Sequence, residues 1–278
     1  HFKIYSTSQA AWDAMYYAIV NAKKSIYWEM YICVDDDAGK RFFDLFEAKA
    51  RAGLDVKVIV DGWGSFWLSR ARLGHLREAG VDIQIFHERK RRYRGIWHKI
   101  ITRTHRKILI VDEAIGFIGG VNVQKYMRDW FDLHVRIEGP AVHSLLRAFA
   151  KMYLICGGRR NAVRHLLRHS LRGEYELRET VDFIYDDGNG HSSRMRQQYL
   201  AALRNAKKRV LFVSPYYFLD KEFLRALWQT RQRGVRVDLL IPLRTDMRIA
   251  TYAAYAWFSA LTKVGAKIHI MDRMMHGK

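Results

Sequence analysis

The sequence is poor in the residues that build metal sites, disulfide frameworks and flexible linkers. Its 278 residues include two cysteines and three prolines, and neither a CxxC nor an HExxH spacing occurs. Cys33 and Cys156 each stand in an apolar stretch, so we expect both to be reduced core residues. We therefore predict that the protein uses no metal and no cofactor, and that no flexible linker divides it.

Long apolar runs and acidic residues are also scarce. Because no run of about 20 apolar residues occurs, the sequence predicts no bilayer-spanning helix. It begins at His1, without an initiator Met, and ends at Lys278, and we expect it to be a piece of a longer protein. Lys and Arg number 48 against 28 Asp and Glu, a formal charge of +20. This excess predicts an anionic partner, either nucleic acid or an acidic membrane surface.

What is present instead is one pattern written twice. The residues Asn-Ala-Lys-Lys at 21–24 return at 205–208. Each copy continues into strand-like runs and into helices that stop at glycine. These glycines are Gly53 and Gly80 in the first copy and Gly234 and Gly265 in the second. Strands that alternate with helices predict an α/β fold with a mostly parallel sheet flanked by helices.

The repeat also predicts how the chain is divided. We expect two lobes of similar fold, 1–157 and 191–278, related by an approximate twofold axis, with a basic connecting segment at 158–190. Such symmetry brings equivalent loops together at one seam. The active site is therefore predicted at the seam between the lobes.

Two basic segments interrupt the pattern. Residues 87–99 belong to an insertion in the first copy and place five cations between positions 89 and 94, with Trp97 following. This mixture suits anionic lipid head groups, and a merely solvated loop is the alternative. Residues 159–172 repeat arginine at helical spacing beside leucines. That basic amphipathic helix either rests on a membrane or packs on the protein and faces water.

Each copy ends in a histidine followed two positions later by a lysine, first His105 and Lys107, then His276 and Lys278. Residues 107–111 are apolar after the lysine and predict a buried strand. On a strand His105 and Lys107 share a face, so both can converge on one phosphate. In a single His-x-Lys pair the histidine is often an ordinary core or surface residue. The recurrence of the pair in the second copy favours a catalytic site.

The first motif extends through Asp112 to Gly119-Gly120-x-Asn122, and this arrangement resembles the signature of the phospholipase D superfamily. Segments 130–142, 214–218 and 275–278 resemble its bacterial cardiolipin synthase branch. The resemblance covers nearly the whole chain. The second motif would be completed by an Asp five positions beyond Lys278, where the sequence ends, so the second half-site is expected to be incomplete here.

The resemblance implies a two-histidine reaction at phosphorus. It makes His105 the nucleophile that forms a covalent phosphohistidine and His276 the general acid, although the residues themselves do not fix that order. Near-neutral titration lets one imidazole be neutral while the other is protonated. Lys107 and Lys278 would neutralise the nonbridging oxygens, with the Asn122 amide as a further donor.

The other candidate residues have positioning roles. Gly119 and Gly120 are expected to let the backbone approach the phosphate. Asp112 belongs to the signature and counts among the catalytic candidates, but its position on the opposite strand face also suits structural pairing. Glu29 and Asp132 stand at strand-like positions and are candidates to hold a catalytic imidazole by accepting its second N–H.

The resemblance implies transphosphatidylation, with two phosphatidylglycerol molecules joined into cardiolipin and glycerol released. The expected partner is then an anionic phospholipid, and the expected location is the cytoplasmic face of a bacterial membrane, as a peripheral protein; nucleic acid is the less favoured partner. A phospholipase D hydrolase or a nuclease uses the same chemistry and stays open. So does a non-catalytic protein that binds membrane surfaces. The sequence does not set the oligomeric state.

Overall fold

The computed structural model describes residues 1–86, 104–173, 193–216, 220–243, 245–246 and 248–277. The chain falls into two compact units. The first unit comprises His1–Asp129 and Leu133–Asp182, and the second comprises Trp130–Asp132 and Phe183–Lys278. The basic insertion at 87–99 and the predicted site residue Lys278 lie outside the described residues. The lobe boundaries expected from the repeat stay a prediction.

The first unit is built on a seven-stranded sheet of order β1-β7-β6-β5-β2-β3-β4. Its elements are β1 (Phe2–Thr7), α1 (Ser8–Val20), β2 (Ser25–Met30), α2 (Lys40–Arg51), β3 (Asp55–Asp61), α3 (Arg70–Glu78), β4 (Asp82–Phe86), β5 (Ile108–Val111), β6 (Ile115–Gly119), the 3-10 helix η1 (Lys125–Met127), β7 (Phe131–Glu138), α5 (Val142–Ile155) and α6 (Arg160–Gly173). Strands β2, β3 and β4 are parallel. Strands β5, β6 and β7 extend the sheet through antiparallel pairs.

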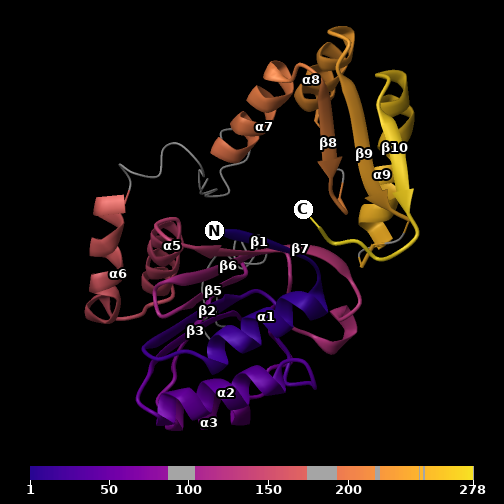
Figure 1. Ribbon diagram of the computed structural model, residues 1–278. Helices are drawn as coiled ribbons and strands as arrows, with labels where there is room; N and C mark the ends of the chain where they lie inside the picture. Colours follow the sequence, from indigo (N-terminus) through magenta and orange to yellow (C-terminus); the bar gives the residue numbers. More distant parts are fainter. Residues whose placement is uncertain (87–103, 174–192, 217–219, 244, 247, 278) are drawn as a thin grey trace, which may run out of the picture. The chain divides into compact units, whose positions relative to one another are not determined.

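Helices cover both faces of this sheet, as predicted. Trp28 of β2 packs against Phe42 and Phe46 of α2, whereas its neighbour Tyr27 stacks on Phe149 of α5 with 5.4 Å between ring centroids. Because side chains alternate along a strand, these neighbours must face opposite sides. In Figure 1, α1, α2 and α3 lie together, away from α5 and α6.

The second unit repeats the order of the parallel part. Its elements are α7 (Arg194–Asn205), β8 (Arg209–Val213), α8 (Lys221–Gln232), β9 (Arg236–Pro242), α9 (Arg248–Lys263) and β10 (Lys267–Met271). The strands form a parallel sheet of order β10-β9-β8. Gly53 and Gly234, equivalent in the repeat, both end a helix with a positive φ, of 88° and 81°, which favours glycine. The α/β class is therefore confirmed.

The cysteines are free, but only one lies in the core. Cys33 is buried, and burial raises the pKa of its thiol to about 12 against the opposing hydrogen bond with Ser65. Cys156 follows α5 and is only partly buried, so the expectation of two core cysteines is wrong for Cys156. Within the described ranges no helix has the length and apolar character needed to cross a bilayer.

Candidate functional site

The first motif lies where β5 begins. That strand starts at Ile108, so the expectation that His105 and Lys107 lie on a strand is wrong; both are in the irregular segment before it. The two side chains nevertheless converge, with Lys107 Nζ 3.1 Å from His105 Nδ1. Tyr31 lies beside both, its ring centroid 4.7 Å from that of His105 and 5.0 Å from Lys107 Nζ. His105 is exposed, whereas Lys107 is buried.

Glu29, at the end of β2, anchors the residues on either side of His105. Its buried carboxylate accepts hydrogen bonds from Thr104 Oγ1 at 2.7 Å and from Arg106 Nε and Nη2 at 2.8 and 2.5 Å. The expectation that Glu29 holds an imidazole is therefore not met, because a buried carboxylate is best matched by a guanidinium that binds it through two nitrogens. Sequence reasoning missed Arg106, although it lies inside the motif.

Asn122 is fixed so that its amide nitrogen can donate. Its Oδ1 accepts the Ile32 N–H at 3.2 Å, and its backbone carbonyl accepts Trp12 Nε1 at 2.8 Å. Since a backbone N–H needs an acceptor, the oxygen must be the atom that faces Ile32. Among the described residues no acceptor forms a hydrogen bond with the amide nitrogen, so Asn122 can donate to an anion.

The two glycines of the motif are used by the sheet. A Cβ on Gly119 would collide with the carbonyl of Leu133 on β7, and the N–H of Gly120 donates to that same carbonyl at 2.8 Å. Close packing of β6 on β7 therefore explains Gly119, and Gly120 joins the sheet through its backbone N–H. The expectation that the two glycines open the backbone to a phosphate stays a prediction.

Asp112 stands at the far end of β5 from His105 and has a structural role. Its carboxylate accepts the backbone N–H groups of Lys23, Lys24 and Ser25 at distances from 2.7 to 3.1 Å. Burial alone raises the pKa of Asp112, but these donors outweigh it and hold the pKa below its usual value. The structure thus removes Asp112 from the catalytic candidates and favours the structural alternative.

Asp112→Asn is expected to lower the free energy of unfolding by about 1–3 kcal/mol, because one acceptor oxygen and the negative charge are lost. Asn tolerates the φ of 53° at this turn, so the change isolates that loss. A depressed carboxyl pKa contributes stability that is present at neutral pH and lost as the pH falls below about 4. Urea unfolding at pH 7 should separate variant from wild type, and the difference should shrink in acid. Glu78→Gln, an exposed change on α3, serves as the control, and equal stability of both variants would contradict the role.

The second motif has a buried imidazole–carboxylate pair within the second unit. His276 Nδ1 lies 2.8 Å from Asp132 Oδ2, and both side chains are almost fully buried. The pair is fixed by backbone bonds, from His276 N to the Phe131 carbonyl and from Phe131 N to the Met274 carbonyl. The ring of Trp130 lies 5.6 Å from that of His276. A carboxylate on Nδ1 orients the ring and leaves Nε2 as the nitrogen that exchanges a proton.

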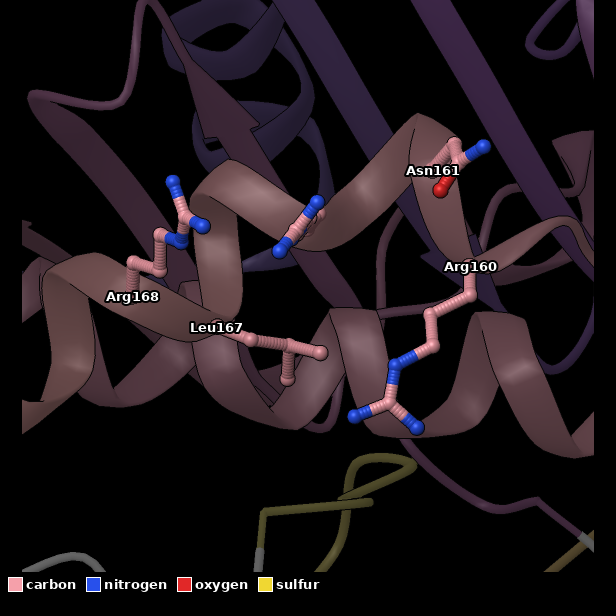
Figure 2. Close-up of a pocket in the computed structure, with 5 residues that line it drawn as sticks. Arg160, Asn161, Leu167 and Arg168 are labelled. Atoms are coloured by element: carbon pink, nitrogen blue, oxygen red, sulfur yellow. The ribbon is translucent and has the colours of Figure 1, made fainter.

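Helix α6 is basic on its exposed side. Val163 and Leu166 are fully buried where α6 packs along α5. A hollow of about 420 Å³ on this helix is lined by Arg160, Asn161, Arg164, Leu167 and Arg168, whose side chains Figure 2 shows, and the three arginines are exposed. Among the described residues no carboxylate pairs with these arginines. The apolar side is therefore packed against the protein and the arginines are exposed, an arrangement that fits both expected surroundings of the exposed side, a membrane surface and water.

Comparison with known proteins finds similar sequences along most of the chain. Residues 15–153 and 199–278 match the sequence model of a family described as cardiolipin synthase, PLD-like domain. The chain belongs to this family. A cardiolipin synthase of Alkalihalophilus pseudofirmus is 29% identical over 99% of this chain and 56% of its own length. Cardiolipin synthase B of Salmonella typhimurium is 31% identical over 96% and 66%, respectively. The chain thus spans between about half and two thirds of the length of these curated relatives.

A solved structure has a similar fold. A phosphatidylserine synthase of Haemophilus influenzae superposes with a TM-score of 0.68 over 100% of this chain and 74% of its own. At 14% identity this likeness concerns the fold alone. The family resemblance inferred from the His-x-Lys motifs is confirmed, while the roles of the individual residues rest on their contacts.

Proposed function

We propose that the protein transfers a phosphatidyl group between phospholipids, joining two phosphatidylglycerol molecules into cardiolipin with release of glycerol. Membership of the cardiolipin synthase family supports the class of reaction. The observation that carries the proposal for this chain is the buried pair of His276 and Asp132, because a water-excluded imidazole on a carboxylate is suited to proton transfer. His105 beside a buried lysine supplies the second group that the reaction needs.

In the first step a nitrogen of His105 attacks phosphorus, and the bond from phosphorus to the glycerol oxygen breaks. His276 gives its proton to that oxygen, so glycerol leaves as a neutral alcohol. Lys107, Lys278 and Asn122 neutralise the nonbridging oxygens as negative charge builds up. In the second step the hydroxyl of another phosphatidylglycerol gives its proton to His276 and attacks phosphorus, which breaks the bond to His105.

The contact between Lys107 and His105 must change during this cycle. An ammonium group only donates, so His105 Nδ1 is the acceptor in that contact. A neutral ring in this state carries its proton on Nε2, which then lacks a lone pair for attack. A bound phosphodiester attracts Lys107 Nζ to its own oxygen, and the ring proton can move to Nδ1. Withdrawal of Lys107 by the substrate thereby frees a ring nitrogen of His105 for attack.

The proposal is tested with purified protein and vesicles that contain phosphatidylglycerol of two distinguishable acyl compositions. Mass spectrometry should detect cardiolipin that combines both compositions, and glycerol should appear in equal amount. Phosphatidic acid without cardiolipin would instead identify a hydrolase. Cleavage of DNA without any lipid product would identify a nuclease, and no product at all would support a non-catalytic binding protein.

The same proposal places the protein peripherally on an anionic membrane surface, on the cytoplasmic face. Its charge of +20 and the outward arginines of α6 support this partner. Guanidinium groups without carboxylate partners favour phosphate-bearing surfaces. Because the apolar side of α6 is already packed on α5, the expected interaction of this helix is electrostatic, without insertion.

Changing Arg160, Arg164 and Arg168 together to Gln is expected to weaken binding to vesicles rich in phosphatidylglycerol by about 10- to 100-fold, from roughly 1 kcal/mol per cation near the surface. Sedimentation with vesicles at low salt measures the partition. The control removes the same charge elsewhere, by Arg194→Gln, Arg209→Gln and Arg225→Gln on exposed positions of the second unit. An equal loss in both triple variants would show that net charge alone, and not α6, sets the binding.

A further inference from the structure

The loop between β3 and α3, residues 62–69, presents large aromatic side chains to solvent, and we call it the aromatic loop. The exposed fractions are 50% for Trp63, 48% for Phe66 and 73% for Trp67. Phe66 and Trp67 lie edge to face with 5.2 Å between ring centroids. Exposed rings gathered on one short loop of a soluble surface cost free energy and usually mark a site of interaction.

The aromatic loop is held in shape by its polar and small residues. Asp61 accepts the N–H groups of Trp63 and Gly64 at 2.9 and 3.0 Å. Ser65 is buried and donates to the Tyr31 carbonyl at 3.0 Å, and Leu68 is buried as well. Ser65 and Leu68 thus point into the protein, whereas the aromatic rings of the loop are exposed. The exposure of these rings is therefore part of a defined loop conformation.

The aromatic loop and the first motif lie along the same edge of the sheet, the edge formed by the carboxyl ends of β2 and β3. Strands β2 and β3 run parallel, with Met30 opposite Val60, and β5 runs antiparallel to β2, with Ile108 opposite Glu29. The start of β5 and the end of β3 are therefore at one edge. Tyr31 connects them directly, because its ring contacts His105 and a Cβ on Gly64 would come within 2.9 Å of that ring.

The charges near this edge do not oppose an anionic surface. Asp35 is paired with Arg72 at 2.9 Å and Asp37 with Lys125 at 2.5 Å. Asp36 accepts backbone N–H groups, including that of Lys125 at 2.7 Å. The loop itself carries no charged side chain between residues 62 and 69. Its chemistry is thus that of rings with a polar rim, which suits the boundary between lipid head groups and acyl chains.

We infer that the aromatic loop inserts Trp63, Phe66 and Trp67 into the interface of a phospholipid bilayer and so presents His105 at the level of the head groups. The inference rests on the proposed function for its choice of a lipid surface as the partner. It goes beyond that function by assigning the docking residues. A lipid phosphodiester lies at the interface, so a nucleophile next to an inserted loop meets its substrate without extracting it from the membrane.

The test uses vesicles of phosphatidylcholine and phosphatidylglycerol at 0.5 M salt, where attraction between surface charges is screened to within about 4 Å. The double variant Phe66→Ser with Trp67→Ser should lower the bound fraction by roughly tenfold or more, from the lost apolar area. Trp228→Ser removes a tryptophan of 48% exposure on α8 and should bind as the wild type does. Thermal unfolding of each variant establishes that it is folded.

A second measurement addresses depth directly. Lipids brominated near the head of the acyl chain should quench wild-type fluorescence more than that of Trp67→Phe, which keeps an aromatic ring. Equal binding by the double variant and the wild type, or equal quenching in the wild type and Trp67→Phe, would overturn the inference. Neither measurement depends on turnover, so a protein that makes no cardiolipin but binds through these rings would refute the proposed function and leave the docking loop standing.

Discussion

His105→Ala should abolish phosphatidyl transfer, with kcat lowered by about 10⁴- to 10⁶-fold, the range expected when a nucleophile is removed. The loss should be the same for phosphatidylglycerol and for an activated p-nitrophenyl phosphodiester, because both need the attacking nitrogen. Quenching of the wild type with SDS at mildly alkaline pH, which preserves the acid-labile P–N bond, should trap labelled protein from ³²P-labelled substrate, and His105→Ala should trap none. Release of p-nitrophenolate and counting of precipitated label measure the two effects.

His75→Ala is a suitable control, since His75 is an exposed histidine on α3 outside the motif. It should retain both transfer and labelling. Transfer that survives in His105→Ala would show that another group attacks phosphorus. Labelling that survives while transfer is lost would move the covalent bond to a different residue, with His276 as the first candidate to examine.

Much of the fold could be predicted because the sequence signals within each copy of the repeat depend on residues that are close in sequence. Helix ends at Gly53 and Gly234 and the strands that follow depend on residues within a few positions, and both copies gave the same signal. The start of β5 was misplaced by one residue at Lys107, because a buried lysine with an apolar stretch after it looks like part of the strand. The turn at Asp112, which makes β5 and β6 antiparallel, contains no glycine, so the sequence did not indicate a turn there.

The candidate site was less predictable because its contacts are distant in sequence. His276 and Asp132 are 144 residues apart, so the strand-like position of Asp132 made it a candidate but did not identify its partner. Glu29 looked equivalent to Asp132 on the same ground, yet its buried carboxylate pairs with Arg106 at the first motif. The aromatic loop has neither helical nor strand periodicity, and Trp63 and Trp67 are therefore indistinguishable from core residues until their exposure is known.

Asp132→Asn should lower kcat for phosphatidylglycerol by about 10²- to 10⁴-fold, the range seen when the carboxylate behind a catalytic imidazole becomes an amide. The amide can donate to Nδ1 and so stabilise the ring with its proton on the wrong nitrogen. It also removes the negative charge that stabilises the protonated ring. A group that donates its proton to the departing glycerol oxygen would then be impaired, while attack by His105 would not.

Substrates with different leaving groups distinguish a role of Asp132 in proton donation from a purely structural role. A p-nitrophenyl phosphodiester releases its alkoxide without protonation, so the first, single-turnover release of p-nitrophenolate should be impaired far less in Asp132→Asn than the release of glycerol from phosphatidylglycerol, whereas His105→Ala should lose both. Asp129→Asn, a change at an exposed carboxylate three residues away, should be normal on both substrates. Equal losses of Asp132→Asn on the two substrates would mean that Asp132 only maintains the fold around His276. A selective loss would make the buried pair the proton donor, and the order of the two histidines would follow from it.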